Sequence, residues 1–204
     1  MKPDRAVRCS GFPCEDIRQD LHAVPNPEID PERIRVIMIS EAPAPNLADN
    51  FYSSGTPFFV ETTTDAFRLA GFEVKDMSDV LNLGVYITTA VKCGKVGYGV
   101  SKETIKTCST LILENELSLF PATRAYMLMG DVAIKAFNNI VKKRTGKNLI
   151  PTAPTYKVRK AEYSYDGKRV FPSYLQTGKS YLIEKSKQKM IAEDIRSALK
   201  YAKQ

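Results

Sequence analysis

Four cysteines are the residues of this chain whose type and spacing most clearly predict chemistry. Cys9 and Cys14 stand near the start, and Cys93 and Cys108 form a second pair in mid-chain. Disulfides are rare in a reducing cytosol, so a metal or cluster site competes with simple buried thiols. Thiolates bind both zinc and iron–sulfur clusters, and these spacings do not separate the two. The residues alone therefore leave zinc, an iron–sulfur cluster and buried thiols as alternatives.

The positive charge of the chain is concentrated in its C-terminal third. Residues 131–204 hold 17 Lys and Arg against 6 Asp and Glu, whereas residues 1–130 hold 13 against 17. A one-sided basic field suits a phosphate-binding surface, because counterion release supplies much of the affinity for nucleic acid. The alternative is a solvated, lysine-rich final helix. No strongly amphipathic aromatic face accompanies the basic residues, which argues against a membrane surface.

Strands and helices alternate along the chain, and three strands are apolar on both faces. We expect strands at 35–40, 85–91 and 125–129, helices at 15–22, 63–69, 102–119, 132–142 and 180–202, and a hairpin of 156–165 with 168–174. This order predicts a three-layer α/β/α sandwich with a mostly parallel central sheet. Residues 41–55 then form a loop at the carboxyl end of the first strand, where open α/β sheets bind ligands.

Length and composition restrict the class of protein further. The 204 residues, 43% hydrophobic and 26% charged, suffice for one α/β domain with a full core. We expect one domain over 1–204, with an irregular N-terminal segment over 1–33. No apolar run approaches the roughly 20 residues that cross a bilayer, and the start lacks the apolar stretch of a secretory signal. The expectation is a cytoplasmic, nucleoid-associated monomer without membrane contact.

Five short motifs follow one another along the chain: SEAPA at 40–44, GTPF at 55–58, YITTAVKC at 86–93, LMGDVAIKAF at 128–137 and VFPSY at 170–174. Together they resemble the iron–sulfur (family 4) uracil-DNA glycosylases from about Cys9 to the C-terminus. The resemblance implies a uracil-DNA glycosylase-like fold. It also implies a structural 4Fe–4S cluster on Cys9, Cys14, Cys93 and Cys108, with zinc as the alternative. The early cysteine pair is more widely spaced here than is usual in that family.

The resemblance also implies how a base would be held. A glycosylase takes the base out of the stack and stabilises the charge that develops as the N-glycosidic bond breaks. By resemblance, Phe58 stacks on the base, unless it only belongs to the core. Ala42 and the surrounding loop backbone contact the base, and Glu41 is the candidate catalytic residue, orienting water or capping the next helix.

Two departures from the family pattern affect the expected activity. Thr89 stands where the family has an Asn that reads the uracil edge, and a hydroxyl cannot replace a carboxamide's donor and acceptor. The family's His-Pro pair aligns with Leu175 and Gln176, or alternatively with Phe171 and Pro172, so neither alignment supplies a histidine. Losing one such donor costs about 10²–10³ in rate. We therefore expect weak or absent excision of uracil.

The loop after the last strand has the sequence LQTGKS, at the place where these enzymes enter the minor groove. The predicted DNA-contacting residues of this loop are Leu175, Gln176, Lys179 and Ser180. The TGKS sequence is not a P-loop, because Ser173 stands where the first glycine is required. Four basic residues of the hairpin are expected to contact phosphates or to be simply exposed: Arg159, Lys160, Lys168 and Arg169.

Two functions are consistent with these residues. The first is a base-excision DNA glycosylase of altered specificity, acting on a damaged or deaminated base in duplex or single-stranded DNA. The second is a catalytically inactive, DNA-binding relative that keeps the fold and the cluster. A third and weaker alternative is a protein–protein module with a relict pocket. The loops SEAPA and GTPF favour the enzyme, whereas Thr89 and the missing histidine favour the binding protein.

Overall fold

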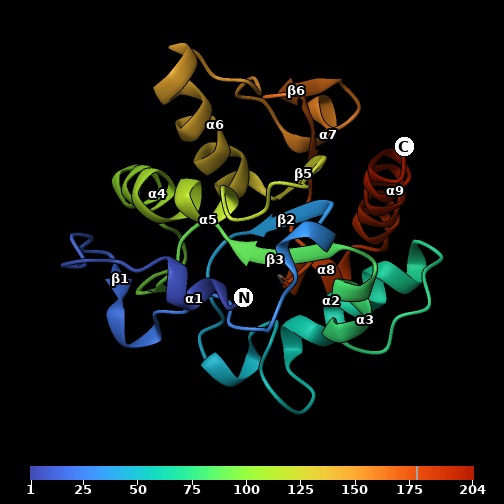
Figure 1. Cartoon of the computed structure of the whole chain (residues 1–204), viewed down its shortest axis with the longest axis horizontal. Helices are drawn as coiled ribbons and strands as arrows, with labels where there is room; N and C mark the ends of the chain where they lie inside the picture. Colours follow the sequence, from blue (N-terminus) through green and yellow to red (C-terminus); the bar gives the residue numbers. More distant parts are fainter. Residues whose placement is uncertain (178) are drawn as a thin grey trace.

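A five-stranded sheet with the order β3-β2-β5-β7-β6 forms the centre of the fold (Figure 1). The computed structural model describes residues 1–177 and 179–204, except for the side chains of Lys179 and Ser180. The first four strands are parallel, and the edge strand β6 is antiparallel. The strands are β2 (Val36–Ser40), β3 (Val85–Thr89), β5 (Ala125–Met129), β6 (Tyr163–Tyr165) and β7 (Lys168–Ser173). β2, β3 and β5 are buried along their whole length, as their continuous apolar sequences predict.

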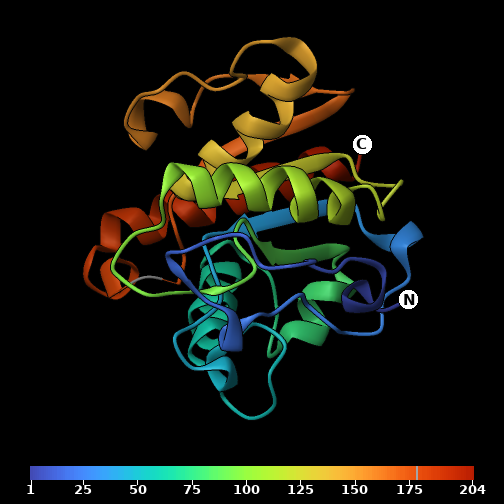
Figure 2. The ribbon, with the colours of Figure 1, turned by 90° about the vertical axis from the view of Figure 1, so that its left-hand side faces the viewer.

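Helices cover both faces of this sheet. The longer ones are α2 (Phe58–Leu69), α3 (Met77–Asn82), α4 (Lys102–Cys108), α6 (Asp131–Thr145) and α9 (Lys185–Ala202). α4 continues through a π-helical stretch, η4 (Ser109–Leu113), into α5 (Glu114–Leu117). α4, α5 and α6 lie on one side of the sheet, and α2, α3 and α9 lie on the other (Figures 1 and 2). One core contains side chains of the first three helices, and the other contains those of the second three. The predicted three-layer α/β/α sandwich is confirmed.

The shorter elements lie mainly near the N-terminus. They are α1 (Pro3–Ala6), β1 (Ile17–Arg18), η1 (Gln19–Leu21), η2 (Pro31–Arg33), η3 (Leu47–Asp49), β4 (Gly94–Lys95), α7 (Thr155–Val158) and α8 (Lys179–Ile183). β1 pairs with β4 as a separate antiparallel ribbon. This ribbon fastens the N-terminal segment to the loop that follows β3. No helix in the described part of the chain is long and apolar enough to cross a membrane.

Three expectations about local structure were wrong. The segment 15–22 is not a helix, because Ile17 and Arg18 pair with β4 before a single 3-10 turn. The first hairpin strand is much shorter than expected, since Pro154 precedes the short helix α7 and leaves only three residues in β6. The final helix is interrupted at Glu184, whose backbone (φ −99°, ψ 86°) is not helical.

The turn between β6 and β7 agrees with its sequence. Asp166 and Gly167 both have positive φ, 52° and 72°, as the two-residue turns that suit a twisted hairpin require. The register then pairs Tyr165 with Lys168. The Asp-Gly signal therefore located the hairpin correctly, although the strand leading into it is short.

The carboxyl ends of the four parallel strands lie along one edge of the sheet. Backbone hydrogen bonds join the residues that follow one strand to the end of its neighbour. The N–H of Ala90 donates to the Ser40 carbonyl at 2.8 Å. On the other side, the N–H of Gly130 donates to the Ser173 carbonyl at 3.0 Å. Gly130 has φ 94°, and an added Cβ would stand 3.3 Å from Leu175. A glycine is thus required where β5 turns into α6 beneath the loop after β7.

Candidate functional site

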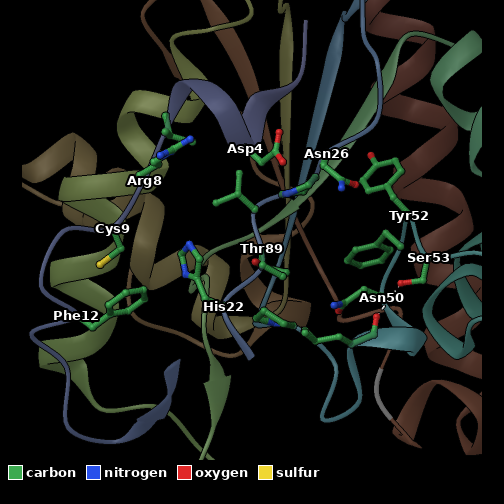
Figure 3. Close-up of a pocket in the computed structure, with 17 residues that line it drawn as sticks. Asp4, Arg8, Cys9, Phe12, His22, Asn26, Asn50, Tyr52, Ser53 and Thr89 are labelled. Carbon is green, nitrogen blue, oxygen red and sulfur yellow. Dashed lines mark hydrogen bonds between the residues drawn. The ribbon is translucent and has the colours of Figure 1, made fainter. Parts of the chain in front are cut away.

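A cavity of about 550 Å³ lies beside the carboxyl end of β3 (Figure 3). Its size falls within the range of small-molecule sites, roughly 300–1,000 Å³. One wall comes from the loop after β2, and the other comes from the N-terminal segment. The lining residues on which the argument depends are Asp4, Arg8, Phe12, His22, Asn26, Phe51, Tyr52 and Thr89.

Thr89, the last residue of β3, is the predicted base-pocket residue that lines this cavity. Its side chain is buried, and its Oγ1 has no hydrogen-bond partner among the described residues. A buried hydroxyl without a partner is costly, so such an atom calls for water or a ligand. Its backbone carbonyl is occupied, because it accepts a hydrogen bond from the Lys92 ammonium. Thr89 is therefore fixed in the wall of the cavity, and its buried hydroxyl is unpaired among the described residues.

The loop after β2 is held in place by its own polar groups. The Asn50 Oδ1 accepts from the Ala44 N–H at 2.8 Å, and the Tyr52 hydroxyl accepts from the Ile87 N–H at 2.9 Å. The Tyr52 ring also stacks on Tyr86, with centroids 6.3 Å apart. Burial, opposed by the Ile87 hydrogen bond, raises the pKa of Tyr52 above its usual range. This loop thus presents a rigid, un-ionised aromatic wall.

The predicted catalytic residue Glu41 and the other two predicted base-pocket residues, Ala42 and Phe58, lie outside this cavity. Glu41 forms an ion pair with Lys95, with Oε1 and Nζ 2.7 Å apart. Phe58 is the first residue of α2 and packs, partly buried, against the core that contains α2, α3 and α9. Ala42 is 5% exposed. These three residues are not among those that line the cavity beside Thr89.

Sequence reasoning missed the aromatic residues that do line the cavity. Phe12 comes from the N-terminal segment, and Phe51 and Tyr52 come from the loop after β2 (Figure 3). The adjacent Phe-Tyr pair inside a polar loop was the available signal. In a loop at the ligand-binding edge of an α/β sheet, such a pair predicts a stacking surface as well as Phe58 does.

His22, the single histidine of the sequence, also lies in the wall of the cavity. Its Nδ1 is 3.5 Å from the Cys93 Sγ, and its ring meets Phe12 edge-on with centroids 5.2 Å apart. Burial, followed by the charge of Lys92, lowers the pKa of His22. His22 therefore stands between the cavity and the cysteines, a position that no sequence motif indicated.

The four cysteines line one apolar pocket behind this wall. Burial, then the proximity of Cys108, Cys9 and Cys14, raises the pKa of the Cys93 thiol to about 12. All four are free thiols. The described residues contain no group of three or more His, Cys, Asp or Glu side chains spaced to hold a single metal ion. A single zinc ion would require the sulfur atoms to gather around one point at about 2.3 Å.

A buried ion pair connects the end of β3 with the helix that carries Cys108. Lys92 pairs with Glu116, and both side chains are almost fully buried, 1% and 0% exposed. The Glu116 carboxylate also accepts from the Tyr86 hydroxyl at 2.7 Å and the Thr88 hydroxyl at 2.8 Å. Burial, followed by the charge of Glu116, raises the pKa of Tyr86 well above its usual range. The network fixes the strand end on which Thr89 stands.

The loop after β7 is only partly accessible. Leu175 is half-buried, and Gln176 is fully buried with neither amide atom hydrogen-bonded among the described residues. In this conformation Gln176 does not present its side chain to DNA. The side chains of Lys179 and Ser180, the other two predicted contacts, lie outside the described residues.

Arg159 is not an exposed strand residue. Its side chain is 4% exposed and forms two hydrogen bonds with Asp194, at 2.7 and 3.1 Å. Asp194 also accepts from the Ser173 hydroxyl at 2.7 Å. Arg159 therefore ties α7 and α9 to the end of β7, and the expectation of a phosphate contact was wrong for this residue. Lys160 is exposed and pairs with Glu193.

The fold agrees with a comparison against protein families. The family model described as the uracil DNA glycosylase superfamily matches residues 27–196. The chain therefore belongs to the uracil DNA glycosylase superfamily, a class of DNA glycosylases that act on DNA. The match omits the N-terminal segment, which contributes much of the cavity wall. No curated protein matches the chain.

Proposed function

We propose that this protein is a base-excision DNA glycosylase of altered specificity. It takes a damaged or deaminated base from the DNA stack into the cavity beside Thr89 and hydrolyses its N-glycosidic bond, with weak or no excision of uracil. The unpaired, buried hydroxyl of Thr89 in the wall of a cavity large enough to admit a base carries this proposal. The everted base has an aromatic environment there, since Phe51 and Tyr52 line the same cavity.

The reaction requires a water molecule and a place for the electrons of the broken bond. The water oxygen adds to C1′ of the deoxyribose and loses a proton to solvent, and the base leaves with the electron pair of the C1′–N bond. Hydrogen-bond donors near the base stabilise that charge, and the Thr89 hydroxyl is such a donor. Glu41 pairs with Lys95 and does not line this cavity, so it can orient the water only if the ion pair opens and its side chain turns toward the cavity when DNA binds.

A catalytically inactive DNA-binding protein is the second candidate. It is favoured by Thr89 in place of a base-reading amide and by the commitment of Glu41 to Lys95. Such a protein would still recognise an everted base, but it would leave the glycosidic bond intact.

Single-turnover incubation separates the two candidates. The protein is incubated with duplex and single-stranded oligonucleotides that carry uracil, hypoxanthine, xanthine or an alkylated base, and alkaline cleavage then reveals abasic sites. We expect processing of at least one lesion other than uracil. If no lesion is processed while binding persists with a steep salt dependence, the protein is the inactive relative.

We further propose that Cys9, Cys14, Cys93 and Cys108 hold a 4Fe–4S cluster. The support is their common pocket, which all four cysteines line together with apolar side chains. In such a cluster each thiolate binds a different iron atom, so the four sulfur atoms surround a larger volume than one zinc ion needs. The bound cluster would supply a structural cross-link between the N-terminal segment and α4. The chain's own contribution is to bring two sulfur atoms from the N-terminal segment, one from the loop after β3 (Cys93) and one from α4 (Cys108), and to exclude water with Phe12 and Ile112.

Replacing Cys93 by serine is expected to abolish the brown colour of the purified protein. Iron analysis should fall from about four atoms per chain to near zero, because a 4Fe–4S cluster needs four thiolates. Thr107→Val is the matched control, since Thr107 lines the same pocket without a sulfur atom. A colourless wild-type protein that contains zinc would contradict the cluster.

A further inference from the structure

The N-terminal segment contributes polar side chains to the cavity that the family match does not cover. Asp4 from α1, Arg8 and Asn26 lie in the wall, and all three precede the matched residues (Figure 3). In Figure 3 the cavity is seen between Arg8, Phe12 and His22 on one side and Asn50, Tyr52 and Ser53 on the other. Part of the polar lining of this cavity therefore comes from the segment before residue 27, outside the family match.

Asp4 is the most informative of these residues. Its Oδ1 is buried and has no hydrogen-bond partner among the described residues. An ionised carboxylate only accepts hydrogen bonds, and leaving a buried acceptor unpaired is costly. A ligand that brings N–H donors or positive charge into the cavity would relieve this cost. The carboxylate thus indicates the chemistry of the occupant.

Uracil does not suit such an acceptor. The pairing edge of uracil has a single N–H between two carbonyl oxygens, and these oxygens would face the carboxylate as a second set of acceptors. A 2-amino-6-oxopurine instead presents a ring N–H beside an exocyclic amino group. Two adjacent donors match the two oxygens of a carboxylate, as the guanidinium group of arginine does.

We infer that the cavity selects an N7-alkylated guanine, whose donor edge is read by Asp4. This inference rests on the proposed glycosylase function and names its substrate class. Alkylation at N7 gives the base a positive charge. When water adds to C1′ and the C1′–N9 bond breaks, the electron pair neutralises the ring, and the proton lost by water passes to solvent.

An N7-alkylated guanine as the substrate also explains how the enzyme acts without the histidine of the family. A neutral base leaves as an anion and needs a strong donor, such as the histidine that this chain lacks at Leu175 and Gln176. A cationic purine leaves as a neutral molecule, so that donor is dispensable. A carboxylate near the base also favours the cation when it binds.

The test uses isothermal titration of the full chain with 7-methylguanosine, 7-methylinosine and uridine, in a buffer acidic enough to keep the purine ring N–H. 7-Methylinosine retains the positive charge and lacks the 2-amino group. We expect 7-methylguanosine to bind about 10–100-fold more tightly than either, the range for a hydrogen bond to a charged group. Asp4→Asn should remove this preference, and Asp4→Glu should keep part of it.

Asp131→Asn is the matched control, because Asp131 is an exposed carboxylate on α6 that pairs with Lys135. It should bind all three nucleosides as the wild type does. If Asp4→Asn keeps the full preference, or if uridine binds as tightly as 7-methylguanosine, the inference is overturned and Asp4 only binds a buried water. An oligonucleotide lesion that is still excised in that case leaves the proposed function intact. Failure of both assays would reject both.

Discussion

Replacement of Lys92 by methionine is expected to lower the free energy of unfolding by about 3–5 kcal/mol. Methionine fills much of the volume of lysine but leaves the Glu116 carboxylate buried without its cation. Glu116 is 0% exposed, so water cannot take the place of the ammonium group. Urea denaturation followed by circular dichroism measures the effect, and the midpoint should fall without a change in slope.

Two further variants show whether burial is the cause. In Lys92→Met with Glu116→Gln, the neutral amide still accepts hydrogen bonds from Tyr86 and Thr88, so most of the lost stability should return. Lys135→Met removes an exposed ion pair and should cost at most about 1 kcal/mol. A Lys92→Met variant no less stable than Lys135→Met would mean that the pair is hydrated in solution.

The Lys92 substitution should also affect the functional site, since Lys92 contacts both the strand end that carries Thr89 and the cysteine pocket. Its ammonium binds the Thr88 hydroxyl at 2.6 Å, and its backbone N–H donates to the Cys108 Sγ at 3.3 Å. Thr89 therefore owes its position to a network that reaches the cysteine pocket. We infer that a displacement at the cysteine pocket also moves Thr89 in the wall of the cavity, because both are attached to this strand end.

The sheet could be predicted from the sequence because its signals are local. Strands buried on both faces need continuous apolar residues, and β5 was located to the residue for this reason. The helix predicted at 132–142 extends to Thr145 in α6 and ends at Gly146, whose φ of 77° is common at helix termini. These features depend on residues that are close together in the chain.

The composition of the cavity could not be predicted in the same way, because it depends on contacts between distant segments. Asp4 and Thr89 are brought together only when the N-terminal segment folds over the edge of β3. Arg159 resembles any exposed basic residue until α9 supplies Asp194, 35 residues further along the chain. A buried ion pair between distant segments leaves no periodic pattern in the sequence.

The structure favours one of the two alignments of the family's His-Pro pair, the one with Leu175 and Gln176. Phe171 and Pro172 lie within β7, opposite Met127 and Leu128 of β5. Leu175 instead lies in the loop beyond the strand, where its Cβ approaches Gly130 at the start of α6. Catalytic side chains of α/β proteins stand in such loops at the carboxyl edge, so position 175 is the better place for a donor.

Leu175→His is therefore expected to raise the rate of uracil excision by about 10²-fold or more. The family's histidine aligns with position 175, and an imidazole, unlike leucine, has an N–H that can donate a hydrogen bond to the uracil anion. Adding Thr89→Asn should raise the rate further, because a carboxamide supplies both the donor and the acceptor that the uracil edge requires. Single-turnover assays on a duplex with one uracil measure both effects.

Leu175→Phe is the control for this gain of activity, since it changes the size and shape of the side chain without adding a donor. If Leu175→His and Leu175→Phe act alike, the missing donor does not limit uracil excision at this position. The gain should also be selective. A histidine that helps an anionic base to leave should do little for a cationic purine, whose departure neutralises charge. A gain confined to uracil would thus show that the missing donor, in addition to the fit of the base, limits uracil excision.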